Sequence, residues 1–180
     1  MQSSELNSSR SIWEIAGLAS DGPFPGLEDK LSLFGQFVGD WDIVESQTLE
    51  EDGRWTSETG ELHWRWILEG RAVQDIWMFR DEETNKIVPA GTTVRFYDPE
   101  IDAWHSVWIT PLHRDVDLFL GRKVGTEIVL ERKDPDGVMT KWIFYDVKPN
   151  SFLWRGEKSK DLGETWTVYE KMTIRRKGTS

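Results

Sequence analysis

From Trp41 onward, apolar and polar residues alternate in short runs that are separated by turn signals. Alternation with a period of two is typical of β-strands that bury one face and expose the other. The breaks between the runs carry Gly, Pro, Asp and Asn, and no long helical pattern lies between them. The pattern predicts about ten strands, at residues 41–49, 54–68, 71–80, 91–97, 103–111, 115–123, 126–133, 138–147, 151–159 and 164–176.

Consecutive short strands with tight turns predict an all-β fold, an antiparallel β-barrel of about ten strands. A sheet that closes on itself leaves no edge exposed to another chain. The interior of a small barrel is either filled by side chains or left as one ligand cavity. Many of the predicted strands carry tryptophan, so we expect an interior lined with aromatic rings.

A short helix is predicted before the first strand, at residues 29–38. Apolar residues such as Leu31 and Phe34 recur at helical spacing, Asp29 is the expected N-cap, and Gly39 is expected to end the helix. Because so short a helix is not stable by itself, its apolar face should cover one end of the barrel.

Residues 1–28 are predicted to be an N-terminal extension, and residues 29–177 the barrel domain. Residues 2–10 are polar and Ser-rich, which favours disorder. The apolar positions that follow predict a segment that docks on the barrel or on a partner subunit. These positions are Ile12, Trp13, Ile15 and Leu18.

Pairing across the turns at Glu69-Gly70 and at Asp98 sorts the side chains of two hairpins by face, since directly paired residues point to the same side. The expected pairs are Trp66 with Val73, Trp64 with Asp75, Leu62 with Trp77, Tyr97 with Trp104, Arg95 with Ser106 and Thr93 with Trp108. We assign this tryptophan-rich face to the interior. The opposite face carries Val94, Phe96, Val107 and Ile109, and an apolar patch of this size on the outside predicts a homodimer. A shift of one residue in register would exchange the two faces.

Gly39-Asp40-Trp41 resembles the Gly-x-Trp motif at the first strand of lipocalin-like (calycin) barrels, where the tryptophan closes the barrel base. The stretches 68–77 and 91–99 are similar to a bacterial lipocalin-like family of uncharacterised function. The likeness covers about residues 29–176. It implies a barrel with an internal cavity. Its calycin relatives include haem-binding nitrobindins, fatty-acid binders and cofactor-free phenolic acid decarboxylases, and the likeness does not choose among these activities.

Ser159-x-Asp161-x-Gly163-x-Thr165-Trp166 matches the Asp-box hairpin of sialidases and other propellers. Such a motif predicts a turn in which the Ser and Asp side chains form hydrogen bonds with backbone groups and the tryptophan packs beneath. Propellers repeat the box, and this chain has it once. We therefore interpret it as structural, with no glycosidase activity implied.

The chain has 22 basic and 32 acidic residues, a net charge of −10, and no cysteine. This charge disfavours nucleic acid and anionic membranes as partners. The lack of cysteine excludes disulfides, thiolate catalysis and zinc–thiolate sites. The basic run at residues 175–177 is interpreted as a solvated tail. No secretory signal or membrane-spanning pattern is evident, so we expect a cytoplasmic protein.

Four charged residues alternate with apolar ones inside predicted strands: Asp75, Arg95, Arg155 and Glu170. Buried charges are costly unless they are paired. Arg155 and Glu170 are expected to form an ion pair across the Asp-box hairpin, although both also remain candidates for the ligand site. For Asp75 and Arg95, a structural pair and a functional site are both open.

The functional alternative places a carboxylate or phenolate ligand against Arg95. Asp75 would act as a general acid or base and Tyr97 as a hydrogen-bond donor, so these three are the catalytic residues if the protein is an enzyme. An aromatic pocket would surround them. The predicted ligand-binding residues are Trp64, Trp66, Asp75, Trp77, Arg95, Tyr97, Trp104, Trp108, Arg155 and Glu170, whereas Trp41, Trp142 and Trp166 are assigned to packing.

The three histidines, His63, His105 and His113, lack the spacing of a metal site, and the pairing above places His63 and His105 on the outer face. A haem would need an inward axial histidine, so we expect neither metal nor cofactor. The sequence thus predicts a protein that binds a small apolar or aromatic, anionic or hydroxylated molecule. The alternatives are a cofactor-independent lyase or isomerase that uses the same cavity, and a structural protein with a filled barrel.

Overall fold

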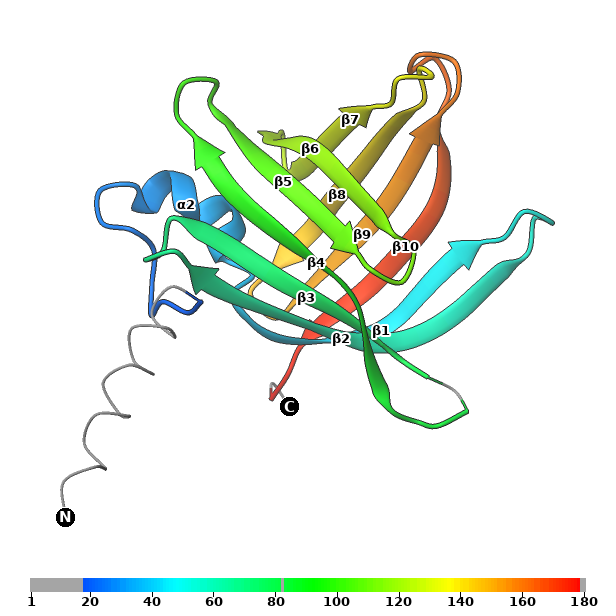
Figure 1. The fold of residues 1–180 in the computed structure, drawn as a ribbon, viewed down its shortest axis with the longest axis horizontal. Helices are drawn as coiled ribbons and strands as arrows, with labels where there is room; N and C mark the ends of the chain where they lie inside the picture. The colour runs from blue at the N-terminus through cyan, green and yellow to red at the C-terminus, as the bar shows by residue number, and fades with distance from the viewer. Residues whose placement is uncertain (1–17, 82, 179–180) are drawn as a thin grey trace.

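The computed structural model describes residues 18–81 and 83–178, which form a closed antiparallel β-barrel of ten strands (Figure 1). Each strand pairs with its neighbours in sequence, and β1 closes the barrel on β10. The predicted fold is confirmed. The strands are β1 (Gly39–Leu49), β2 (Trp55–Ile67), β3 (Ala72–Arg80), β4 (Ile87–Asp98), β5 (Ala103–Thr110), β6 (Asp115–Val124), β7 (Glu127–Lys133), β8 (Met139–Lys148), β9 (Ser151–Ser159) and β10 (Thr167–Arg176).

The predicted helix is present as α2 (Glu28–Gly35), and it lies at one end of the barrel (Figure 1). Phe34 contacts Trp104 with ring centroids 4.9 Å apart, and Phe37, just after the helix, contacts Phe152 at 4.8 Å. These buried rings close that end of the barrel interior.

Both predicted helix boundaries need correction. The N-cap position is Leu27, which makes no side-chain capping bond, and Asp29 lies in the first turn. The helix ends at Gly35 rather than at Gly39, because the amides of Phe37 and Val38 bond to carbonyls only three residues back. This tighter turn brings Phe37 into the core before β1 begins.

The C-terminal basic residues are not the solvated tail that the sequence suggested. Arg176 donates hydrogen bonds to the carbonyl oxygens of Val38, Pro149 and Gln36, and its guanidinium lies 4.0 Å from the ring centroid of buried Trp41. A guanidinium can bind several carbonyls in fixed directions while stacking on an aromatic face. Arg176 therefore ties the end of β10 to the helix end and to the start of β1.

The N-terminal segment that precedes the helix packs along the β2–β3 turn. The amide of Ser20 bonds to the Trp66 carbonyl at 2.8 Å, and the amide of Phe24 bonds to the Gly70 carbonyl at 3.1 Å. Leu18 is exposed. The predictions for residues 2–10 and for Ile12, Trp13 and Ile15 lie outside the described residues.

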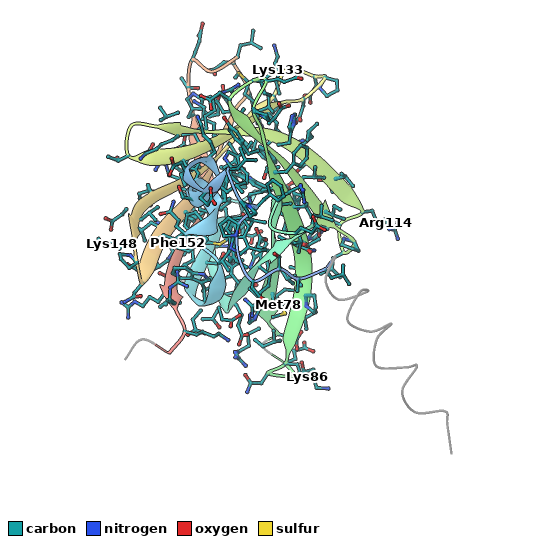
Figure 2. The ribbon with its side chains drawn as sticks, turned by 90° about the vertical axis from the view of Figure 1, so that its left-hand side faces the viewer. Met78, Lys86, Arg114, Lys133, Lys148 and Phe152 are labelled. Carbon is teal, nitrogen blue, oxygen red and sulfur yellow. The ribbon has the colours of Figure 1, made fainter. Side chains whose placement is uncertain are left out.

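The assignment of faces on the two hairpins is confirmed, because all six predicted pairs occur in the β2–β3 and β4–β5 ladders. Trp64 is buried inside, whereas Phe96 and Ile109 are 44% and 38% exposed outside. Figure 2 shows the same division elsewhere: Phe152 is buried, and Lys133 and Lys148 lie exposed at the periphery.

The Asp box forms the predicted stapled turn between β9 and β10. Ser159 Oγ accepts a hydrogen bond from the Gly163 amide at 2.8 Å, and Asp161 accepts bonds from the amide and the hydroxyl of Thr165. These bonds lower the pKa of Asp161 to about 2. Trp166 Nε1 donates a hydrogen bond to the Gly163 carbonyl. The polar side chains of the motif thus form hydrogen bonds with other residues of the same turn.

Candidate functional site

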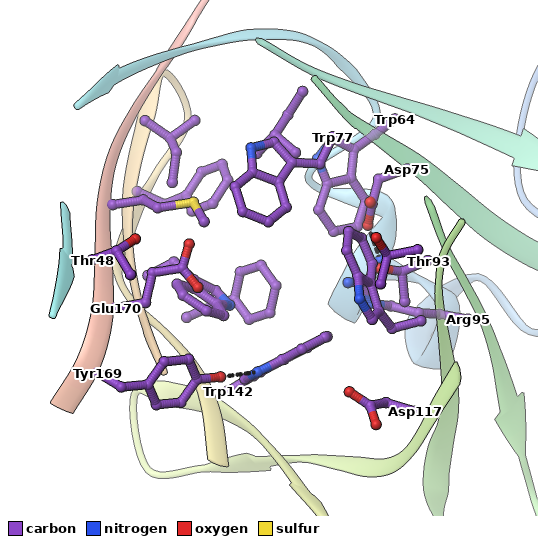
Figure 3. Close-up of a pocket in the computed structure, with 18 of the residues that line it drawn as sticks. Thr48, Trp64, Asp75, Trp77, Thr93, Arg95, Asp117, Trp142, Tyr169 and Glu170 are labelled. Atoms are coloured by element: carbon purple, nitrogen blue, oxygen red, sulfur yellow. Dashed lines mark hydrogen bonds and ion pairs between the residues drawn. The ribbon is translucent and has the colours of Figure 1, made fainter. Parts of the chain in front are cut away.

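The barrel encloses a cavity of about 430 Å³ (Figure 3). Helix α2 and its aromatic contacts lie at one end of the interior, and the exposed residues His113 and Asp115 line the opposite end of the cavity. The lining combines many aromatic rings with several polar groups. It comprises Thr48, Glu58, Leu62, Trp64, Asp75, Trp77, Thr93, Arg95, Trp108, Thr110, His113, Asp115, Asp117, Trp142, Phe144, Phe152, Trp154, Tyr169, Glu170, Met172 and Ile174.

Four indoles form a continuous aromatic wall in this cavity. Ring centroids are 5.8 Å apart for Trp77 and Trp108, 6.0 Å for Trp108 and Trp142, and 5.9 Å for Trp142 and Trp154. We call these four residues the indole wall. Such a surface provides apolar area and ring faces for a planar ligand.

Gly91 on β4 makes room for one ring of this wall. A Cβ atom at Gly91 would lie 2.4 Å from Trp108 Cη2, closer than nonbonded atoms approach. Trp108 can therefore lie across the β4 backbone only because that residue has no side chain.

Asp75 and Arg95 form a buried ion pair on the wall of the cavity. Each is 3% exposed, and the guanidinium also lies 4.5 Å from the Trp64 ring centroid. Burial raises the pKa of Asp75, and the charge of Arg95 opposes that increase. Because Asp75 neutralises Arg95, the guanidinium is not an uncompensated charge that waits for an anionic ligand.

Tyr169 and Glu170 enter the cavity side by side, although adjacent strand residues normally point to opposite faces. The cause is a β-bulge: Val168 pairs with Glu157 and Glu170 pairs with Gly156, which leaves Tyr169 as the extra residue. A bulge redirects one side chain and is common near functional sites. Figure 3 shows both residues on the wall opposite Asp75 and Arg95.

Glu170 has the electrostatics of a proton-exchanging group. Burial raises its pKa to about 7, Glu58 adds to the increase, and Ser46 and Lys158 oppose it. Ser46 Oγ lies 3.5 Å from Glu170 Oε1, the limit of a hydrogen bond. A carboxyl group with this pKa can both donate and accept a proton near neutral pH.

Tyr169 is held as a hydrogen-bond donor. Its hydroxyl accepts a bond from Trp142 Nε1 at 2.7 Å, which leaves the hydroxyl hydrogen for a ligand. Burial raises the pKa of Tyr169, so the phenol stays protonated at neutral pH.

Several predicted site residues lie elsewhere. Trp66 and Trp104 point inward, but they pack under the helix: a Cβ at Gly35 would be 2.4 Å from Trp66 Cζ2, and Trp104 contacts Phe34. They do not line the cavity. The strand pairing predicts that both rings face the interior, but it does not show that the helix fills the space next to them.

Tyr97 and Arg155 also lie away from the cavity. Tyr97, near the end of β4, donates to Asp102 at 2.6 Å. Arg155 bonds to Glu157 at 2.7 Å and to Glu127 at 3.0 Å. The predicted pair of Arg155 with Glu170 is wrong, because the bulge places Glu170 opposite Gly156 instead.

The remaining predicted residues, Trp64, Asp75, Trp77, Arg95, Trp108 and Glu170, all line the cavity. Trp142, which the sequence analysis assigned to packing, lines it as well, as does Trp154. The alternation of Trp142 with Phe144, and of Phe152 with Trp154, was a usable signal for these two residues. Tyr169 had no such signal, because the bulge breaks the alternation.

The histidines are placed as follows. His63 contacts Asp40 and Glu61 on the outer face, and His105 contacts Asp98. His113 lies exposed beside the cavity. Within residues 18–81 and 83–178, no group of three or more His, Asp or Glu side chains is arranged to hold a metal ion.

Comparison with known proteins gives a structural likeness. No family model matches the sequence, and no curated protein matches it. The solved structure of the S-type phycobiliprotein lyase CPES from Guillardia theta superposes with a TM-score of 0.55 at 12% identity, and the match covers 93% of this chain and 98% of that one. That protein has a lipocalin-like barrel. The likeness shows that this chain has the same fold, and at this identity it shows nothing further.

The described part of the chain contains no helix that is long and apolar enough to cross a membrane.

Proposed function

We propose that this protein binds a small, largely aromatic molecule in the barrel cavity, with a hydroxyl or similar polar group placed near Tyr169 and Glu170. The observation that carries the proposal is the cavity of about 430 Å³ with its indole wall. A volume of this size suits a small organic ligand. Indoles that line open space, rather than filling it, favour a binding site over a solid core.

Of the two polar groups expected from the sequence, the hydroxyl is better supported than the anion. Arg95 is already paired with Asp75, and the cavity lining carries further carboxyl groups, among them Glu170 on the wall opposite that pair (Figure 3). The charge of the one guanidinium among the described lining residues is therefore already matched by Asp75 before an anionic ligand enters. A hydroxyl can accept the Tyr169 hydrogen and share a proton with Glu170.

A second candidate function is a cofactor-independent lyase or isomerase acting on the same ligand. Glu170, whose pKa is about 7, and the protonated Tyr169 favour it, because together they supply a proton acceptor and a hydrogen-bond donor. Glu170 and Tyr169 thus take the catalytic roles that the sequence analysis gave to Asp75, Arg95 and Tyr97. Asp75 and Arg95 are paired with each other, and Tyr97 lies outside the cavity. The lyase activity named for CPES fits this class, although the likeness to CPES carries only the fold.

The test begins with native mass spectrometry of freshly purified protein, which reveals a co-purified molecule. Neutral aromatic alcohols are then titrated calorimetrically. Loss of the central ring in Trp108→Leu should weaken binding about tenfold, in line with the energy of an aromatic contact. Trp55→Leu is the control, since Trp55 is 42% exposed and lies outside the cavity lining. If no molecule co-purifies and no neutral aromatic compound binds, the proposal fails.

Further parts of the proposal concern the whole molecule. We place the protein near the bacterial lipocalin-like family that the stretches 68–77 and 91–99 resemble, with residues 29–177 as the barrel domain, 1–28 as an extension and a cytoplasmic location.

We also propose a homodimer through an outer apolar face, defined as Val94, Phe96, Val107, Ile109, Val116 and Leu118. These residues lie in adjacent rows on β4, β5 and β6. In a chain of net charge −10, an uncharged face is where two copies meet with least repulsion.

A further inference from the structure

The charges that line the cavity are unequal in sign. The carboxylates are Glu58, Asp75, Asp115, Asp117 and Glu170, whereas the lining guanidinium is that of Arg95. Asp75 is matched by Arg95, and Asp117 by Arg132 at 2.6 Å. Asp115 and Glu170 line the cavity outside these two pairs, and Glu170 carries a negative charge when it is ionised.

The indole wall provides a second feature that favours a cation. An aromatic face attracts an ammonium group placed over it, most strongly when the ring is tryptophan. Elsewhere in the molecule, rings are covered by the protein's own cations: Lys141 lies 4.1 Å from the Trp166 centroid, and Lys171 lies 4.8 Å from that of Trp55. Among the described residues, no lysine or arginine lies over the four rings of the indole wall in this way, and these rings face the cavity.

We propose that the cavity selects an aromatic amine, whose ring lies against the indole wall and whose ammonium group binds the Glu170 carboxylate. This inference rests on the proposed function and names its ligand class. An ammonium donates hydrogen bonds that a carboxylate accepts, and the neighbouring ring faces stabilise its charge. A carboxylate on the same ring would be repelled.

The preference should depend on pH, because Glu170 binds an ammonium best when ionised. The polar and charged groups around it are Ser46 on β1, Glu58 on β2, Lys158 on β9 and its neighbour Tyr169. The pKa of Glu170 is about 7. An alkylamine stays protonated from pH 6 to pH 8, so a rise in affinity over that range reports the ionisation of the protein carboxyl.

The experiment compares three ligands that share one ring system: naphthylethylamine, naphthylethanol and naphthylacetate. Calorimetric titration of the full-length protein at pH 6, 7 and 8 should show that the amine binds about tenfold or more tightly than the alcohol at pH 8, with the acetate weakest. The affinity for the amine should rise with pH, whereas the affinity for the alcohol should change little.

Two variants, each of which removes one negative charge, distinguish a specific effect of Glu170 from a general effect of the net charge. Glu170→Gln should remove both the preference for the amine and its pH dependence, so that the amine and the alcohol bind with similar affinity at every pH. Glu131→Gln, at a carboxylate outside the cavity lining that pairs with Lys141, should keep both. Equal affinities for amine and alcohol, tighter binding of the acetate, or an unchanged preference in Glu170→Gln would overturn the inference and leave the proposed function standing. Binding of none of the three ligands would count against the proposed function itself.

Discussion

The ring of Tyr169 lies directly over Gly156 on the neighbouring strand. A Cβ atom at Gly156 would be 2.5 Å from Tyr169 Cζ and 2.6 Å from its hydroxyl oxygen. The β-bulge at Tyr169 turns this ring toward the cavity, and Gly156 leaves the space that the ring occupies. The position of the Tyr169 hydroxyl thus depends on a glycine on another strand.

Gly156→Ala should displace this ring and destabilise the protein by about 1–3 kcal/mol, the usual range for overpacking. Urea unfolding measures the change. Gly22→Ala is the control, because a Cβ there meets nothing within 4 Å. Adding Tyr169→Ala should relieve the clash, so that Gly156→Ala costs less in that background. Equal costs in both backgrounds would show that Tyr169 does not fill the space.

The Asp75–Arg95 pair should be structural. Arg95→Leu leaves a buried carboxylate without its partner, and we expect the free energy of unfolding to fall by about 3–5 kcal/mol. Replacing both residues with leucine should recover most of this loss, since it removes both buried charges. Urea unfolding of both single variants and the double variant gives the coupling. A fully stable Arg95→Leu protein with weakened ligand binding would instead return Arg95 to the ligand site.

Glu170 should make the protein less stable as pH rises. Its pKa of about 7 in the folded state lies above the ordinary value of 4.5 for a glutamate, so the folded protein binds more protons than the unfolded chain between these two values. Stability from this group is present below about pH 4.5 and is lost as pH rises through about 7, with an upper limit of about 3 kcal/mol. Urea midpoints at pH 5, 6, 7 and 8 should fall more steeply in the natural protein than in Glu170→Gln. Parallel curves would refute the raised pKa.

The outer apolar face should hold two copies together. Leu118 is 59% exposed and pairs with Val107 on the β6 side of this face, so Leu118→Lys should convert a dimer into a monomer. Leu162→Lys adds the same charge at the Asp-box turn, where Leu162 is 67% exposed, and should leave the dimer intact. Sedimentation at micromolar concentration distinguishes the two states. A monomeric natural protein, or a Leu118→Lys dimer, would contradict this face.

Much of the fold followed from local signals. The alternation of apolar residues and the Gly, Pro, Asp and Asn breaks predicted the strands to within a few residues, since period and turn chemistry act over short distances. The hairpin pairings then placed Trp64, Asp75 and Arg95 on one face. The Asp box predicted its own hydrogen bonds because all its members lie within one turn.

The composition of the site required the tertiary structure. Only packing of the helix showed that Trp66 and Trp104 are covered while Trp108 and Trp142 face open space. Only the ladder between β9 and β10 showed that a bulge brings Tyr169 into the cavity beside Glu170 and puts Glu170 opposite Gly156 rather than Arg155. The sequence by itself thus determined the strands, the closed sheet and most inward faces, because these follow from period and pairing. The three-dimensional structure decided which inward residues border a cavity and which charges are already paired, because those depend on contacts between residues far apart in the chain.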